Sequence, residues 1–196
     1  MGHVSGSGRC DDRVACSAGR PGQTVTPDGS DLISDPSGWS ISTAIPGDLN
    51  GLKDMLRQAQ LPDSGVVIGE FERYLIARDA GGELIGGVGL ELRGNDALLR
   101  SLVVCPEARG AGVGQALLAA AESLARGQGI DTLYLLTLDA AAFFHALGFV
   151  AQERESVPHG IRGTAEFASL CPASAICLRK HMTPATRSNP RPGRPE

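Results

Sequence analysis

Three glycines lie within five residues in the stretch VVCPEARGAGVGQALL, which spans positions 103–118. Gly110, Gly112 and Gly114 follow Arg109 and separate a Val-rich run from a run with helical spacing. Because glycine has no Cβ, the backbone N–H groups of such a turn can approach an anion, and the N-terminus of the following helix adds roughly +0.5 of charge. These residue types at this spacing predict a site for a phosphate-bearing ligand.

Several interpretations compete for this stretch. A Walker loop requires Gly-Lys followed by Ser or Thr, whereas this stretch continues Gly-Gln-Ala, so that interpretation is excluded. A dinucleotide fingerprint requires G-x-G-x-x-G, but the third glycine comes one residue early, and the acidic Asp139 is better explained as a helix cap. A purely structural role, in which the glycines let a helix pack closely on a strand, stays open.

A further interpretation comes from a resemblance carried by two motifs. The first, V-x-P-x-x-R-G-x-G-x-G, resembles the coenzyme A pyrophosphate loop of the GNAT superfamily of N-acetyltransferases; it is formed by Val104, Pro106, Arg109, Gly110, Gly112 and Gly114. The second, AAAFFHALGF, is similar to the A-x-x-F-Y-x-x-L-G-F motif of the same superfamily. The two motifs come in the expected order, and the resemblance covers essentially all of Trp39 to Lys180.

The stretches LPDSG, GVGLE, ALLRSLVV, LYLLT, FFHALGF and EFASLCPASA together resemble one branch, the arsenic-resistance-associated N-acetyltransferases. This resemblance implies that acetyl-CoA is the cosubstrate. It also implies that the acceptor is the primary amine of a small, amino-acid-like molecule, organoarsenicals included. Two other functions stay open: a non-catalytic acyl-CoA-binding regulatory module, and acetylation of protein lysines or N-termini.

The resemblance also implies where the coenzyme binds. The backbone of Leu102, Val103 and Val104 is expected to pair with the pantetheine arm, and an N–H there would face the acetyl carbonyl. The pyrophosphate is expected to lie on Arg109, Gly110, Ala111, Gly112, Val113, Gly114 and Gln115. For Arg109, an ordinary solvated arginine is the alternative.

Phe144 departs from the family pattern. It stands where many GNAT enzymes carry a tyrosine that protonates the leaving sulfur, and a phenylalanine has no proton to give. We still expect Phe144 to lie at the coenzyme site. A thiol pKa near 8.5 makes a free thiolate tolerable, so the missing acid costs no more than about a couple of kcal/mol.

No general base stands out in the sequence. Glu91, Glu70 and Glu72 are candidates that would act through water, and each has an ordinary solvated or ion-paired carboxylate as its alternative. Glu91 and Ser101 are the candidate catalytic residues. Deprotonating an α-amine with a pKa near 8 costs under about 1 kcal/mol at pH 7.5, whereas a lysine amine costs about 4 kcal/mol. The missing acid and base therefore favour an α-amine acceptor.

Arg100 lies within the otherwise aliphatic run ALLRSLVV. An arginine in a central strand must find an anion, because burying an unpaired guanidinium is costly. That anion is either an internal Asp or Glu or the carboxylate or arsinate of a substrate, held by two hydrogen bonds. The residues expected to line the acceptor pocket with Arg100 are Ser101, Thr137, Cys171 and Ser174.

The elements that must position these residues follow from hydrophobic periodicity. Strands are predicted at 39–44, 71–78, 83–92, 97–104, 132–137 and 175–180, with a weak one near Phe149. Helices are predicted over 46–62, capped by Asp48, from Val113 to about 127, and over 138–149, capped by Asp139 and ended by Gly148. The stretch 158–172 is expected to be irregular.

This order predicts an α/β fold, with a GNAT-like mixed, mostly antiparallel central sheet flanked by helices in a single domain. Residues 1–38, rich in Gly, Ser, Asp and Pro, are expected to be a disordered extension. The acetyltransferase domain would span 39–181, followed by a disordered tail at 182–196 with four prolines.

Composition limits the partners. The chain has 196 residues, with 18 Lys and Arg against 22 Asp and Glu, a net charge of −4 that offers no general attraction to nucleic acid or acidic membranes. No apolar run approaches the ~20 residues of a membrane helix. Five cysteines without a C-x-x-C pair favour reduced thiols in the cytoplasm. We expect no metal, and both a monomer and a homodimer stay open.

Overall fold

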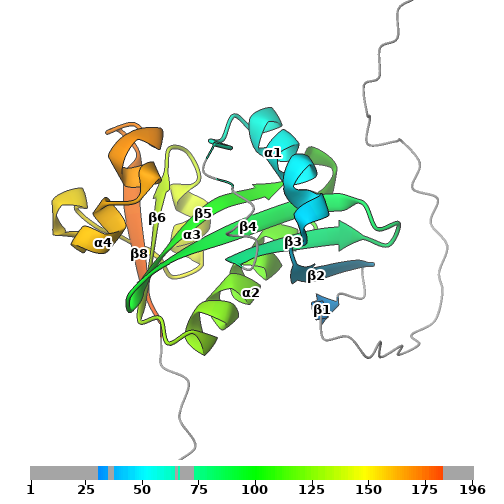
Figure 1. Cartoon of the computed structure of the whole chain (residues 1–196), viewed down its shortest axis with the longest axis horizontal. Helices are drawn as coiled ribbons and strands as arrows, with labels where there is room; N and C mark the ends of the chain where they lie inside the picture. Colours follow the sequence, from blue (N-terminus) through cyan, green and yellow to red (C-terminus); the bar gives the residue numbers. More distant parts are fainter. Residues whose placement is uncertain (1–30, 35–37, 65, 67–72, 183–196) are drawn as a thin grey trace, which may run out of the picture.

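The computed structural model describes residues 31–34, 38–64, 66 and 73–182. Their strands form one mixed sheet in the order β1-β2-β3-β4-β5-β6-β8-β7 (Figure 1). The strands are β1 (Asp31–Ser34), β2 (Trp39–Thr43), β3 (Tyr74–Asp79), β4 (Leu84–Arg93), β5 (Asp96–Val104), β6 (Thr132–Thr137), β7 (Val150–Ala151) and β8 (Ile176–His181). Only β5 and β6 pair in parallel, so the predicted mixed, mostly antiparallel sheet is confirmed.

The helices lie on both faces of this sheet (Figure 1). They are α1 (Leu49–Gln58), α2 (Val113–Gly127), α3 (Ala141–Ala146) and α4 (His159–Arg162). Short 3₁₀ turns are η1 (Pro46–Asp48), η3 (Pro106–Ala108) and η4 (Arg154–Ser156), and η5 (Glu166–Leu170) is a π-helical turn. Together with the sheet they form the α/β arrangement that the sequence predicts.

The hairpin between β3 and β4 follows from its turn residues. Gly82 adopts a φ of +85°, which favours glycine, and the Asp79 carboxylate accepts the N–H groups of Gly81 and Glu83, each at 2.9 Å. The next strand, β5, continues the antiparallel meander. The three-strand meander predicted from the sequence is therefore confirmed.

Two helices pack on opposite faces of the meander. In α1, Leu52 and Leu56 are fully buried and pack in a cluster with Tyr74 and Val103. In α2, the predicted apolar stripe is confirmed: Val113, Leu117 and Ala120 are buried in the largest cluster, and Leu124 packs against it. The long helix α2 then supplies the crossover that makes β5 and β6 parallel.

Glu122 of α2 is more than a surface residue. It pairs with Arg126, four residues further along the helix, at 2.9 Å between Oε2 and Nη2. The Glu122 carboxylate is nevertheless buried, and its other oxygen lies 2.5 Å from Nζ of Lys180 in β8. Glu122 thus joins the helix to the sheet.

The segment after β7 corrects one prediction. Instead of an irregular stretch at 158–172, the chain forms α4 and the π-helical turn η5. Ile161 and Val157 pack there with Leu98 and Tyr134 over β5 and β6. Periodicity misses these turns because each is only four or five residues long.

Two predicted helix caps were wrong. The Asp139 side chain makes no cap; instead, Thr137 Oγ1 accepts the N–H of Ala140 at 3.0 Å, before α3. Asp48 occupies the N-cap position of α1, but its buried carboxylate accepts the Ile45 N–H at 2.7 Å and pairs with Arg78 instead of capping. Before α3 a neighbouring threonine accepts the N–H, and before α1 the aspartate carboxylate is held by other partners.

The N-terminal boundary also moves. The stretch 31–34, inside the predicted disordered extension, forms β1 and pairs with β2. The rest of that extension and nearly all of the predicted tail lie outside the described residues. Within the described ranges, no helix combines the length and the apolar character needed to cross a bilayer.

Candidate functional site

The first feature of the candidate site is the parting of β5 and β6. These strands pair through Asp96, Ala97 and Leu98 only, opposite Thr132, Leu133 and Tyr134. Beyond Leu98, β5 remains paired with β4, but no strand of the described chain pairs with its other edge. That edge presents N–H and C=O groups to which an extended ligand could add as a strand.

A β-bulge lies at the same place. Between the pairs Gly89–Arg100 and Gly87–Val103, Ser101 and Leu102 of β5 together face one residue of β4. Ser101 has a φ of +54°, a conformation that costs a non-glycine residue on the order of 1–3 kcal/mol. The backbone of Ser101 therefore forms the bulge in a strained conformation. The predicted catalytic role of its side chain stays a prediction.

The bulge decides which face of the sheet each side chain joins. Leu98 packs under α4, and Arg100, two residues later, shares its face. After the extra residue of the bulge, Val103 packs with Leu52 and Leu56 of α1. The open part of β5 thus lies between α1 and the α4–η5 region (Figure 1).

The glycine loop follows the open strand after Cys105 and the turn η3. Gly110 and Gly112 have φ values of +81° and +82°, and a Cβ on either would meet no atom within 4 Å. Positive φ, rather than crowding, therefore requires glycine at both positions. Gly114 is different, because its φ is not positive and its Cβ would make only ordinary van der Waals contacts, at 3.6 Å to Val104 and 3.7 Å to Phe143.

Helix α2 begins at Val113, with Gly112 as its N-cap residue. The first N–H groups of a helix have no partner within the helix, and the helix dipole makes that end positive. The 15 residues of α2 thus place free donors at the exposed loop formed by Arg109, Gly110, Ala111 and Gly112. This arrangement can bind a phosphate or pyrophosphate.

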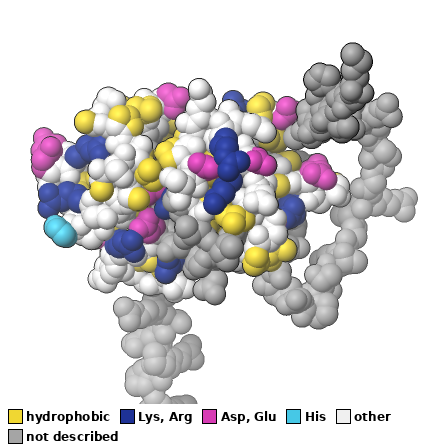
Figure 2. Space-filling model, turned by 45° about the horizontal axis from the view of Figure 1, so that its top comes forward, with side chains coloured by type: hydrophobic (Ala, Val, Ile, Leu, Met, Phe, Trp, Pro, Cys, Tyr) yellow, Lys and Arg dark blue, Asp and Glu magenta, His cyan; other side chains and the backbone are white. Residues whose placement is uncertain are grey.

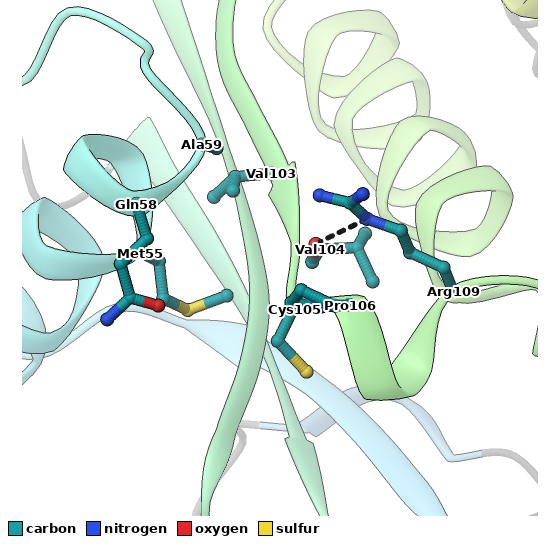
Figure 3. A pocket seen from close by; sticks show the side chains of 8 residues that line it. All are labelled: Met55, Gln58, Ala59, Val103, Val104, Cys105, Pro106 and Arg109. Carbon is teal, nitrogen blue, oxygen red and sulfur yellow. Dashed lines mark hydrogen bonds between the residues drawn. The ribbon is translucent and has the colours of Figure 1, made fainter. Parts of the chain in front are cut away.

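A hollow lies beside the loop, with an empty volume of about 270 Å³ that includes space open to solvent (Figure 3). Its lining comes from the end of α1 and the end of β5: Met55, Gln58, Ala59, Val103, Val104, Cys105, Pro106 and Arg109. The exposed Arg109 donates from Nε to the Val104 carbonyl at 3.3 Å. Arg109 therefore holds the loop against β5 and keeps its other donors for an anion.

Arg100 finds its anions inside the protein. It is only 8% exposed, and its Nη1 lies 3.3 Å from Oε2 of Glu91. Its Nη2 lies 2.5 Å from Oε1 of Glu166 in η5. Glu91 is also buried and pairs with Arg93, so it is not a solvated carboxylate.

Glu166 was missed by the sequence analysis. Burial raises the pKa of its carboxyl group, although the neighbouring Arg100 opposes that rise. Its Oε2 and the Nε of Arg100 are buried without a hydrogen-bond partner in the described structure. The one available signal was Arg100 itself, since a buried arginine requires a carboxylate somewhere in the chain.

The remaining predicted residues divide into two groups. Cys171 joins the Arg100 cluster: its N–H donates to the Glu166 carbonyl at 2.9 Å, and burial raises the pKa of its thiol. Thr137 caps α3, and Ser174 is exposed. Phe144 is buried, with its ring edge-on to those of Phe143 and Phe149 at 5.1 and 5.6 Å.

Two further observations limit the chemistry. Glu70 and Glu72 lie outside the described residues. The parts of the chain that the structure describes contain no group of three or more His, Cys, Asp or Glu side chains able to hold a metal. On the face shown in Figure 2, basic and acidic side chains are interspersed and form no continuous basic surface of the kind that binds a polyanion.

Comparison with known proteins finds similarity to acetyltransferases. A family model described as Acetyltransferase (GNAT) domain matches residues 70–151, which include the open strand, the glycine loop and Phe144. An amino-acid acetyltransferase of Pseudomonas fluorescens (strain Pf0-1) is 28% identical over 139 residues, covering 66% of this chain and 32% of that protein.

Solved structures share the fold. N-acetylglutamate synthase from Neisseria gonorrhoeae, complexed with coenzyme A and L-arginine, superposes with a TM-score of 0.64 at 23% identity, over 74% of this chain and 34% of that chain. PaiA N-acetyltransferase from Thermoplasma acidophilum, in complex with coenzyme A, gives 0.57 at 20%, over 73% and 98%. Ribosomal-protein-S18-alanine N-acetyltransferase from Escherichia coli gives 0.55 at 19%, over 77% and 98%.

The chain spans about a third of the length of the Pseudomonas and Neisseria enzymes. The matched domain and these relatives support a GNAT-type acyltransferase with acetyl-CoA as cosubstrate. At these identities the structural neighbours show the fold alone.

Proposed function

We propose that this protein transfers an acetyl group from acetyl-CoA to the primary amine of a small, amino-acid-like acceptor. One observation carries the proposal: β5 loses its neighbour β6 immediately before a loop with two positive-φ glycines at the N-terminus of α2. The open strand edge suits a pantetheine arm, and the loop suits a pyrophosphate. Both are parts of coenzyme A.

The transfer makes four demands on the site. The thioester must be held, the oxyanion stabilised, the amine deprotonated and the thiolate released. Backbone N–H groups of Leu102 to Val104 meet the first two. Phe144 cannot protonate the thiolate, so the thiolate leaves unassisted by that residue. Without a strong base, an α-amine is the favoured acceptor, because it needs less help to lose its proton.

The acceptor proposal has two levels. The amino-acid acetyltransferase of Pseudomonas fluorescens supports a small amino-acid acceptor. The resemblance to arsenic-resistance-associated enzymes adds organoarsenical amino acids, and with them a role in arsenic resistance in the cytoplasm. A panel of acceptors decides between these levels.

A non-catalytic acyl-CoA-binding module is the second candidate. The buried Phe144, placed in the motif that carries a tyrosine in many GNAT enzymes, is the observation that favours it. Such a module would bind the coenzyme and release no thiol with any amine.

Two measurements test the proposal. Acetyl-CoA at a hundred times its dissociation constant should stabilise the protein by about 2.7 kcal/mol, which is measurable as a higher melting temperature. Thiol release is then followed with amino acids, organoarsenical amino acids and simple amines. Absence of thermal protection would overturn the proposal, and protection without thiol release would support the binding module. Intact-mass analysis of extract proteins would reveal protein substrates.

A further inference from the structure

The ion pairs around Arg100 balance one another in charge, and all of their side chains except that of the exposed Arg93 are buried. Arg93 and Arg100 lie against Glu91 and Glu166, so two positive charges face two negative charges. Arg100 and Glu166 are 8% and 7% exposed, and the side chains come from β5 on one side and η5 on the other. A ligand that enters this cluster without disturbing its balance must itself carry no net charge.

Pairing within the cluster is incomplete. Glu166 Oε2 has no hydrogen-bond partner in the described structure, and neither has Arg100 Nε. The contact between Arg100 Nη2 and Glu166 Oε1, at 2.5 Å, is an ion pair. A buried polar group left unpaired costs about 1–3 kcal/mol, and more when it is charged. The two side chains therefore offer unused donors and an unused acceptor side by side.

The position of the pair suits an acceptor. Arg100 is the last residue before the bulge, and Leu102 opens onto the unpaired edge of β5. At a rise of about 3.3 Å per residue, their Cα atoms are separated by no more than about 7 Å. Glu166 lies in a π-helical turn, a geometry that occurs frequently at functional sites.

We infer that Arg100 and Glu166 together bind the acceptor as a zwitterion, with Arg100 holding its α-carboxylate and Glu166 its α-ammonium group. This inference rests on the proposed function and adds a substrate class and a new substrate-binding residue, Glu166. Entry of the zwitterion exchanges one internal ion pair for two, and the net charge of the cluster stays zero. An amine without the carboxylate would satisfy only Glu166.

The electrostatics of Glu166 agree with this role. Burial raises the pKa of its carboxyl group, and an ammonium group beside it would favour the ionised form again. Glu91 is less suited to receive the ammonium, because Arg93 and Arg100 already occupy both of its oxygens. The acceptor amine therefore goes to Glu166 rather than to Glu91.

The first test uses the unmodified full-length protein. Thiol release from acetyl-CoA is compared for an accepted α-amino acid, its carboxamide and its decarboxylated amine. We expect kcat/KM to be roughly tenfold to a hundredfold higher for the amino acid, the range for losing one hydrogen bond to a charged group. Equal kcat/KM values would overturn the inference while leaving the acetyltransferase proposal standing. Absence of thiol release with every amine would overturn the acetyltransferase proposal itself.

The second test isolates Glu166. In Glu166→Gln, we expect KM for the amino acid to rise roughly tenfold or more, while thermal protection by acetyl-CoA remains. Glu166→Asp should recover part of the loss, and Glu155→Gln, an exposed glutamate on η4, is the matched control. Because all three acceptors carry the amine that Glu166 is proposed to hold, KM should rise for each of them, whereas a purely structural ion pair would lower the melting temperature and kcat and leave KM unchanged. If Glu166→Gln fails to fold, Arg100→Lys is measured with the same acceptors, and an unchanged preference for the carboxylate would overturn the inference.

Discussion

Replacing Gly112 by alanine separates ligand binding from backbone strain, because α2 offers a matched control at its other end. Gly112 and Gly129 have φ values of +82° and +75°, and a Cβ on either would meet no atom within 4 Å. An alanine in this left-handed conformation costs about 1–2 kcal/mol. Both variants should therefore lose similar stability, equivalent to roughly 2–8 °C in melting temperature for a domain of this size.

Only the Gly112→Ala variant should lose affinity for the coenzyme. Its methyl group would stand in the open space before the free N–H groups of α2, where the pyrophosphate is proposed to lie. A tenfold weaker affinity corresponds to about 1.4 kcal/mol. At a ligand concentration a hundred times the original dissociation constant, protection would fall from about 2.7 to about 1.4 kcal/mol.

The assay is thermal unfolding of the wild type, Gly112→Ala and Gly129→Ala, each with and without acetyl-CoA. We expect equal melting temperatures for the two variants without ligand, and a reduced shift for Gly112→Ala alone with ligand. An undiminished shift in Gly112→Ala would refute the assignment of the loop. Equal reductions in both variants would show that strain, not the site, weakens binding.

Two further predictions concern stability. Burial raises the pKa of Cys177 from 9.0 to about 11, so on raising the pH this thiol ionises first in the unfolded chain. The stability that the neutral buried thiol provides below pH 9 should therefore fall by up to about 2–3 kcal/mol as the pH rises to 11. In urea titrations at several pH values, the free energy of unfolding should fall less steeply with pH in Cys177→Ala than in the wild type. Val157→Ala removes packing from the same cluster and should keep the wild-type pH dependence. The same pH dependence in both variants would contradict the attribution of this effect to the Cys177 thiol. Glu122→Gln should lower the free energy of unfolding by about 1–2 kcal/mol, because the partly exposed Lys180 and Arg126 lose their shared carboxylate. Arg126→Ala should lower it by less, because the pair of Glu122 with Lys180 remains. The reverse order in urea unfolding would show that Lys180 contributes little.

Local chemistry explains why the conformation of the glycine loop could be predicted. The loop residues are consecutive in the chain. Gly110 and Gly112 have positive φ, a conformation that the glycine residue type itself indicates. The apolar spacing of Val113 and Leu117 then fixes which way α2 packs. Strand, loop and helix follow one another without a long-range choice, so a pattern of some fifteen residues was enough.

The Arg100–Glu166 pair, the proposed acceptor site, depends on contacts that no local sequence pattern records. Arg100 and Glu166 are 66 positions apart and meet only because β5 lies beneath η5. Periodicity could state that Arg100 needs an anion, but it could not choose among the acidic residues of the chain. The turn that carries Glu166 is too short to produce a detectable period, so its residue stayed unnoticed.

The bulge at Ser101 was equally hidden, for a different reason. A serine has no preference for a φ of +54°, so its residue type does not indicate this backbone conformation. The cause is tertiary: β5 must stay paired with β4 on one edge while it leaves β6 on the other. Strain at such a place persists only where the surrounding sheet imposes it.

In the proposed reaction, β5 is the element that joins the acyl carrier and the acceptor. Its backbone beyond the bulge faces the proposed acyl carrier, and its side chain just before the bulge carries the proposed acceptor anchor, Arg100. Because the extra residue keeps Arg100 and Val103 on one face, a shift of one residue in this register would move Arg100 to the α2 side of the sheet. Glu166 would then lose its partner although no site residue had changed. In the proposed complex, the alignment of amine and thioester therefore depends on the pairing of β5 with β4, the most extensive contact in the sheet.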